Sequence, residues 1–161
     1  RHVAQDIVNS GLQLVVLGSG EAAYESFFSE LAARNPGAVG VKIAFVPSLA
    51  RKIYAGADMF LMPSKSEPCG LSQMVALRYG TIPTGGLRDS IHDSGDGWGN
   101  GFTFRSYNAH DMLNAVLRAK AGYEYPDGWQ QLVKRAMECD FSWSASAKQY
   151  VEMYQQVCQL W

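Results

Sequence analysis

Cysteine is scarce in this sequence, and its spacing argues against two common kinds of site. The three cysteines are Cys69, Cys139 and Cys158, an odd number without a CxxC pair. Such a set is neither the framework of a disulfide-stabilised secreted domain nor the pattern of a zinc site. The three histidines are also far apart in the sequence. We therefore expect a protein of a reducing compartment, the cytoplasm, without a bound metal or other cofactor.

Long apolar runs and an excess of one charge are also lacking. No stretch approaches the roughly 18 apolar residues that a membrane-spanning helix needs. The 14 basic and 15 acidic residues give a formal net charge of -1 and are spread along the chain. Proteins that bind nucleic acid or acidic membranes usually carry a basic patch, so we expect neither partner.

What the sequence does contain is an alternation of apolar runs with segments of helical periodicity. With 161 residues, 47% of them hydrophobic, the chain can bury one core, and we expect a single domain over residues 1–161. The alternation predicts the α/β class, with a Rossmann-like parallel sheet and helices on both faces, up to about residue 108. Residues from about 109 to 161 are predicted to be helical only. Because the first residue is Arg1 and not Met, we expect the chain to be part of a longer protein.

The predicted elements follow from periodicity and from glycine and proline positions. Strands are expected at residues 12–17, 39–46, 59–62, 81–83 and 101–104. Helices are expected at residues 2–10, 21–34, 47–54, 71–79, 109–121, 127–138 and 143–160.

The last predicted helix carries an apolar stripe. Its members follow one another at steps of three and four residues: Trp143, Ala147, Tyr150, Tyr154, Val157 and Trp161. Such a stripe is usually part of the core of its own domain. The alternative is a helix that crosses onto a neighbouring domain.

A first glycine-rich turn, at residues 18–23, matches the loose dinucleotide-binding pattern GxGxxA. That interpretation also requires an acidic residue at the end of the next strand, where this sequence has Phe45-Val-Pro47. A tight turn between strand and helix is the alternative. In either case, Gly18 is placed where ligands of open α/β sheets bind.

A second turn, at residues 67–71, lies between a predicted buried strand and a helix. Pro68 stiffens the turn, and Gly70 allows the backbone to approach a ligand closely. We expect the amides of residues 70–73 to be free first-turn donors, which together with the helix dipole and the Ser72 hydroxyl suit a pyrophosphate. Glu67 is placed to hold sugar hydroxyls or a developing positive charge. The alternative is a capped turn with a solvated glutamate.

A third turn begins at Thr84 and contains the paired glycines Gly85 and Gly86. It follows the next predicted strand, so we expect it to face the same cleft as the second turn. Phe45, at the end of the second strand, offers a flat surface for a purine or ribose. The alternative for Phe45 is an ordinary core aromatic.

The residues around these turns resemble the glycogen and starch synthase family. The resemblance is carried by KIYAGADMFLMPSKSEPCGLSQ at 52–73, ALRYGTIP at 76–83 and TGGLRD at 84–89. Asn108-Ala and Asp140-Phe-Ser-Trp143 add to it, so that it covers nearly the whole chain.

The resemblance implies a fold and an activity. In that family two Rossmann-like domains form a GT-B fold, and the C-terminal one, which these residues resemble, binds the sugar nucleotide. The implied reaction transfers glucose from ADP-glucose to the non-reducing end of an α-1,4-glucan, with retention and without a metal. The glucan acceptor would be held by an N-terminal domain that is not in this sequence, and residues 1–161 alone would be inactive.

The resemblance also implies roles for individual residues. Glu67 resembles the cleft carboxylate beside the donor glucose, and Gly70, Leu71 and Ser72 resemble the amides that bind the diphosphate. Gly18 and Phe45 would line the nucleotide pocket. The remaining residues assigned to donor binding lie in the second and third turns: Cys69, Gly85 and Gly86.

The sequence departs from the family in three ways. A basic Arg and Lys pair that neutralises the donor phosphates would lie before Arg1. Val75 stands where related glycosyltransferases have a second glutamate. Pro83 and Thr84 are adjacent in this sequence, whereas the family usually has further residues between these two positions. Two alternatives stay open: another GT-B glycosyltransferase using UDP-glucose or a different donor, and a non-catalytic module that binds a nucleotide or a glucan.

Overall fold

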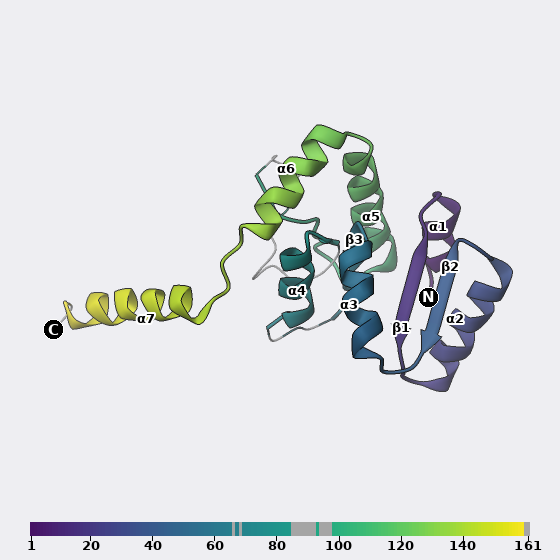
Figure 1. Ribbon diagram of the computed structural model, residues 1–161, viewed down its shortest axis with the longest axis horizontal. Coiled ribbons are helices and arrows are strands. Elements are labelled where there is room, and N and C mark those ends of the chain that lie inside the picture. Colours follow the sequence, from purple (N-terminus) through teal and green to yellow (C-terminus); the bar gives the residue numbers. More distant parts are fainter. Residues whose placement is uncertain (66, 68, 85–92, 94–97, 160–161) are drawn as a thin grey trace.

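The computed structural model describes residues 1–65, 67, 69–84, 93 and 98–159. Parallel strands and helices alternate in its first half, and helices follow in its second half (Figure 1). The strands are β1 (Leu14–Gly18), β2 (Val39–Ile43), β3 (Met59–Leu61) and β4 (Ile82–Thr84). The helices are α1 (Ala4–Asn9), α2 (Ala22–Arg34), α3 (Pro47–Gly56), α4 (Leu71–Tyr79), α5 (Ala109–Tyr123), α6 (Pro126–Met137) and α7 (Trp143–Cys158).

The first packing unit consists of α1, β1, α2 and β2. Strands β1 and β2 are parallel, with Leu14 opposite Val39 and Val16 opposite Val41. Ala4 of α1, Leu31 of α2 and Val39 of β2 form a buried cluster, against which Leu14 and Val41 also pack. Both helices therefore cover the same face of the β1–β2 pair, and burial of these apolar side chains holds the unit together.

The second packing unit contains β3, β4 and the helices α4, α5 and α6. Strands β3 and β4 are parallel, with Met59 opposite Ile82. A larger core cluster lies under these elements and comprises Leu77, Ile82, Phe102, Ala119, Trp129, Leu132 and Ala136. The ring of Phe102 stacks on Trp129, with 6.5 Å between ring centroids. This core fixes α4 against the end of β4, and α4 is the helix that follows the second predicted turn.

The structure confirms the α/β class and the parallel arrangement of strands. It differs from the expected single sheet, since the described strands pair as β1–β2 and β3–β4 and these two pairs are not hydrogen-bonded to each other. The expected strand at residues 101–104 is reduced to isolated bridges, in which Phe102 pairs with Thr84 and Gly101 pairs with Asp93. None of the helices that the structure describes combines the length and hydropathy needed to cross a bilayer.

The last helix, α7, extends away from both packing units at the end of the segment 138–142 (Figure 1). Its start follows the sequence prediction, because the Ser142 hydroxyl accepts a hydrogen bond from the Ala145 amide and caps the helix. None of its residues up to Cys158 is buried, and Trp143, Tyr150 and Tyr154 are exposed. The prediction that the stripe belongs to the core of its own domain is therefore wrong. The crossing onto a neighbouring domain stays a prediction.

Candidate functional site

The turn between β3 and α4 is built around one glycine. Gly70 is the N-cap residue of α4 and has φ 67° and ψ 38°, the left-handed conformation that glycine adopts without strain. A Cβ at this position would lie 2.6 Å from Nε2 of Gln73. The backbone angles therefore favour glycine, and a Cβ would also force the Gln73 side chain to shift. This conformation sets the direction in which the first amides of α4 point.

Gln73 lies directly under this turn and is 2% exposed. Its Oε1 atom has no hydrogen-bond donor among the residues that the structure describes, which is unusual because buried polar atoms are normally paired. This buried amide was not predicted from the sequence, since glutamine in the first turn of a helix is normally solvated. The sequence analysis considered only the backbone amide of Gln73 and missed the part that its side chain plays in the site.

Two of the four amides expected to be free are in fact engaged. The Gly70 amide donates to Oε1 of Glu67 at 3.3 Å, and the Gln73 amide donates to the Gly70 carbonyl at 2.9 Å. This corrects the prediction for residues 70–73. Among the described residues, the amides of Leu71 and Ser72 are the ones left without an acceptor in the first turn of α4.

The structure brings Glu67 to the same helix end. Its carboxylate is half-buried and lies beside the Gly70 amide, at the positive end of the α4 dipole. Ser72 is half-buried as well, whereas Cys69 and the side chain of Leu71 are exposed, Leu71 to 66%. Glu67, Gly70, Leu71 and Ser72 therefore form one group, in which two free amides and a carboxylate adjoin each other.

Gly18 and Phe45 form a second group at the ends of β1 and β2. The Ala44 amide donates to the Gly18 carbonyl at 3.1 Å, which holds the two strand ends together. Phe45 is 89% exposed. The alternative of a core aromatic is therefore excluded, and the ring is available for stacking. The described strand pairings do not join this group to the one at α4.

Gly85 and Gly86 lie outside the described residues, but both ends of their segment are fixed. Thr84 is buried and bridges to Phe102. Oδ2 of Asp93 accepts hydrogen bonds from the Thr103 amide and hydroxyl at 2.8 and 3.0 Å. Arg118 of α5 donates to both carboxylate oxygens of Asp93, at 2.8 and 3.1 Å. Sequence reasoning missed this ion pair, because its partners are far apart in the chain.

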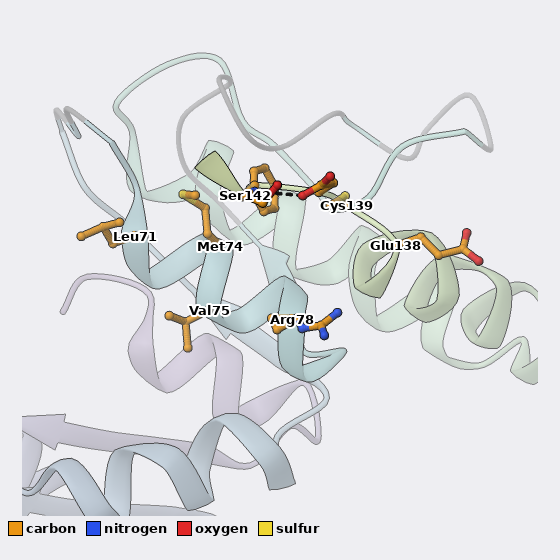
Figure 2. Close-up of a pocket in the computed structure, with 9 residues that line it drawn as sticks. Leu71, Met74, Val75, Arg78, Glu138, Cys139 and Ser142 are labelled. Atoms are coloured by element: carbon orange, nitrogen blue, oxygen red, sulfur yellow. Dashed lines mark hydrogen bonds between the residues drawn. The ribbon is translucent and has the colours of Figure 1, made fainter. Parts of the chain in front are cut away.

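A separate depression lies between α4 and residues 138–142 (Figure 2). It has a volume of about 570 Å³ and is lined by Leu71, Met74, Val75, Arg78 and residues 138–142. Figure 2 shows Met74 and Val75 of α4 on one side and Cys139 and Ser142 on the other. Its lining is largely apolar, with a cation at Arg78 and carboxylates at Glu138 and Asp140, so it is less suited to an anion than the end of α4.

The cysteines and the acidic residues make no metal centre in the part of the chain that is described. No group of three or more histidine, cysteine, aspartate or glutamate side chains gathers there. Cys69, Cys139 and Cys158 are free thiols. Cys139 has a packing role, since its sulfur accepts a hydrogen bond from Nδ2 of Asn100 at 3.2 Å.

Comparisons with known proteins identify close relatives. No family model matches the chain. Over 161 aligned residues it is 53% identical to a glycogen synthase of Geobacillus thermodenitrificans, with 96% of this chain and 33% of that protein covered. It is 49% identical to a glycogen synthase of Syntrophotalea carbinolica, with 97% of this chain and 34% of that protein covered.

A solved structure of a related enzyme also matches this chain. The catalytic domain of starch synthase IV from Arabidopsis thaliana, bound to ADP and acarbose, superposes with a TM-score of 0.83 at 36% identity. The match covers 97% of this chain and 34% of that one. The chain thus spans about a third of the length of the curated relatives that it matches.

Proposed function

Because this chain belongs to the glycogen and starch synthase family, we propose that it forms the nucleotide-sugar-binding part of a retaining glucosyltransferase. The substrates are ADP-glucose and the non-reducing end of an α-1,4-glucan. The observation that carries the proposal is the end of α4, where Gly70 aims two free amides and Glu67 adjoins them. The related starch synthase IV domain, solved with ADP and acarbose, supports a nucleotide at this family's site.

The end of α4 is suited to the diphosphate. The Leu71 and Ser72 amides and the helix dipole provide fixed positive charge, and the Ser72 hydroxyl adds a donor. When the bond between glucose C1 and the diphosphate oxygen breaks, negative charge grows on that oxygen, and these donors stabilise it. ADP leaves, and the acceptor 4-hydroxyl bonds to C1 as its proton passes to the departing diphosphate oxygen.

Glu67 and the second group complete the donor site in this proposal. The Glu67 carboxylate accepts hydrogen bonds from the glucosyl hydroxyls and positions the ring; the Gly70 amide holds that carboxylate. Gly18 and the exposed ring of Phe45 line the nucleotide pocket, with Phe45 as a stacking surface. Cys69, Gly85 and Gly86 are assigned to the same site through their turns. No metal takes part, and the free cysteines favour a reducing, cytoplasmic location.

The glucan acceptor binds elsewhere in the longer protein, as does part of the donor. With about a third of a relative's length, this chain supplies one wall of the active site. The experiment must also distinguish two alternative functions. One is a glycosyltransferase of the same fold that prefers UDP-glucose, and the other is a non-catalytic nucleotide- or glucan-binding module.

The test is glucose incorporation into glycogen by the full-length protein. We expect turnover with ADP-glucose, and we expect Glu67→Gln to lower kcat by about 100-fold or more, because neutral glutamine keeps the shape but loses the charge. Glu138→Gln is the matched control, since Glu138 is exposed and its carboxylate pairs with Lys134 of its own helix end at 3.9 Å. It should leave kcat unchanged.

Other outcomes of the same assay contradict the proposal in distinct ways. Turnover with UDP-glucose alone would assign the protein to another glycosyltransferase group. Binding of ADP without turnover of any donor would identify a non-catalytic module. Full activity of Glu67→Gln would remove Glu67 from the site.

A further inference from the structure

Gln73 stands at the position of α4 from which a glutamine side chain normally caps the helix. With Gly70 as the N-cap, Gln73 is the third residue of the helix, and the side-chain oxygen of a glutamine there typically accepts a hydrogen bond from the N-cap amide. In this structure the Gly70 amide donates to Oε1 of Glu67 instead. Oε1 of Gln73 is buried and meets no donor among the described residues. The cap and its natural acceptor are therefore both present but not joined.

The carboxamide of Gln73 touches the residue whose amide it would cap. A Cβ on Gly70 would lie 2.6 Å from Nε2 and 3.3 Å from Cδ of Gln73, so the end of this side chain packs against the Gly70 Cα. The oxygen and nitrogen of a carboxamide are nearly equal in size, and the terminal torsion of glutamine is broad, so a half-turn of the group needs little extra room. That half-turn exchanges Nε2 for Oε1 and places an acceptor beside Gly70.

The bond that now occupies the Gly70 amide is long for an N–H···O hydrogen bond, at 3.3 Å from nitrogen to Oε1 of Glu67. Gly70 is buried, whereas Glu67 is only half-buried and is partly open to a ligand. A sugar hydroxyl that binds Oε1 of Glu67 competes with the Gly70 amide for that oxygen. Because an unpaired buried amide is costly, Glu67 turns fully to a sugar at low cost only when another acceptor takes its place.

We propose that Gln73 is a positioning residue of the donor site, which takes over the Gly70 amide when Glu67 turns to the glucosyl hydroxyls. The Gly70 amide holds the carboxylate until the sugar arrives. With the donor bound, Gln73 caps α4 and Glu67 binds the sugar, so that all three groups are paired and the cost of the unpaired Gln73 oxygen is removed. Glu67 is drawn away by a sugar only if the proposed function is correct, so this inference rests on that function.

The first test follows the Gly70 amide in the full-length protein by residue-resolved hydrogen exchange, without any sugar. We expect Glu67→Ala to change Gly70 exchange by less than about threefold, because Oε1 of Gln73 takes over the amide. Adding Gln73→Met removes both acceptors and should speed the exchange at least about tenfold. The Gly80 amide, which donates to the Leu77 carbonyl at 3.0 Å at the other end of α4, is the internal control and should not change.

The second test compares stability with kinetics for Gln73→Met, which keeps the length of the side chain and removes its oxygen. We expect kcat/KM for ADP-glucose to fall about tenfold, with the urea midpoint unchanged or raised because the unpaired oxygen is gone. In a Glu67→Gln background the same change should have no further effect, since Gln73 acts through Glu67. Gln13→Met is the matched control: Gln13 is exposed and donates to the Gly37 carbonyl at 3.1 Å, so kcat/KM should not change.

Different results would overturn the inference and the proposed function. Fast Gly70 exchange in Glu67→Ala alone, or unchanged exchange in the double variant, would show that Gln73 does not take over the amide. Equal fractional losses of kcat/KM in both backgrounds, or a lowered urea midpoint in Gln73→Met, would make Gln73 a purely structural residue. No turnover of ADP-glucose by the unmodified protein would contradict the proposed function, while the exchange test would still decide whether Gln73 takes over the amide.

Discussion

A side chain at position 70 would meet the buried Gln73. We expect Gly70→Ala to destabilise the protein for two reasons: its φ of 67° costs a non-glycine residue about 1–2 kcal/mol, and its Cβ would lie 2.6 Å from Gln73 Nε2. Urea denaturation measures the loss. The Km for ADP-glucose in the full-length enzyme should rise as well, since the amides of residues 71 and 72 follow directly from this turn.

The matched control is Gly37→Ala. Gly37 has φ 79°, and a Cβ there would meet nothing within 4 Å, so it isolates the cost of the backbone angle. We expect Gly70→Ala to cost about 1–3 kcal/mol more than Gly37→Ala, because overpacking adds to the strain. Equal losses at both positions would mean that Gln73 moves aside without cost and does not support the turn.

Asp111 gives the start of α5 a dependence on pH. Its carboxylate accepts hydrogen bonds from the amides of Ser106 at 2.9 Å and Arg105 at 3.1 Å. The Ser106 bond, and then the Arg105 bond, lowers the pKa of Asp111 below its ordinary value of 3.8. When the pKa of a carboxyl group is lower in the folded state than in the unfolded state, the ionised group stabilises the fold. This stabilisation is fully present at pH values above the unfolded-state pKa and is lost as the pH falls through the folded-state pKa.

We therefore expect Asp111→Asn to reduce the free energy of unfolding at pH 7, and the difference from the unmodified protein to shrink below pH 3.8. Urea titrations of both proteins at neutral and acidic pH measure this. A difference that stays constant with pH would show that the charge of Asp111 is not involved.

At the scale of elements, the strand–turn–helix unit around α4 was predictable from the sequence. Leu71–Tyr79 was predicted with its observed bounds, because Gly70 and Gly80 flank it, both at positive φ. Such a turn joins a strand end to a helix start, so the residues that form it are close together in the sequence. Glu67 therefore fell beside the helix end, as expected.

What the sequence could not give depends on residues far apart in the chain. The burial of the Gln73 side chain follows from tertiary packing. The pair Arg118 and Asp93 joins α5 to a loop 25 residues away in sequence. The apolar stripe of α7 has the periodicity of a core helix, but periodicity alone does not show whether other residues pack against it.

The two faces of α4 should differ sharply in their tolerance of mutation. Leu77 is 0% exposed in the larger core cluster, so we expect Leu77→Ala to cost about 2–5 kcal/mol through lost burial and a cavity. Leu71→Ala on the same helix should stay within about 0.5 kcal/mol, since the Leu71 side chain is exposed and its backbone amide is retained. Thermal or urea unfolding compares them, and similar losses would contradict the assigned packing.

At the scale of the whole molecule, the cores are separate. One lies between α1, α2 and the β1–β2 pair, and the other lies under α4, α5, α6 and β4. They are connected through contacts of α1 with α5 and of α3 with α4, whereas the described strands of the two units do not form a shared sheet. Cooperative unfolding requires strong coupling between parts, and no strand-to-strand hydrogen bonds couple these two units among the described residues.

We therefore expect residues 1–161 on their own to unfold in more than one step. Amide exchange at increasing urea should give different midpoints for Leu31, in the smaller core, and for Leu77, in the larger one. Coincident midpoints in residues 1–161 would show that the helix contacts alone couple the cores.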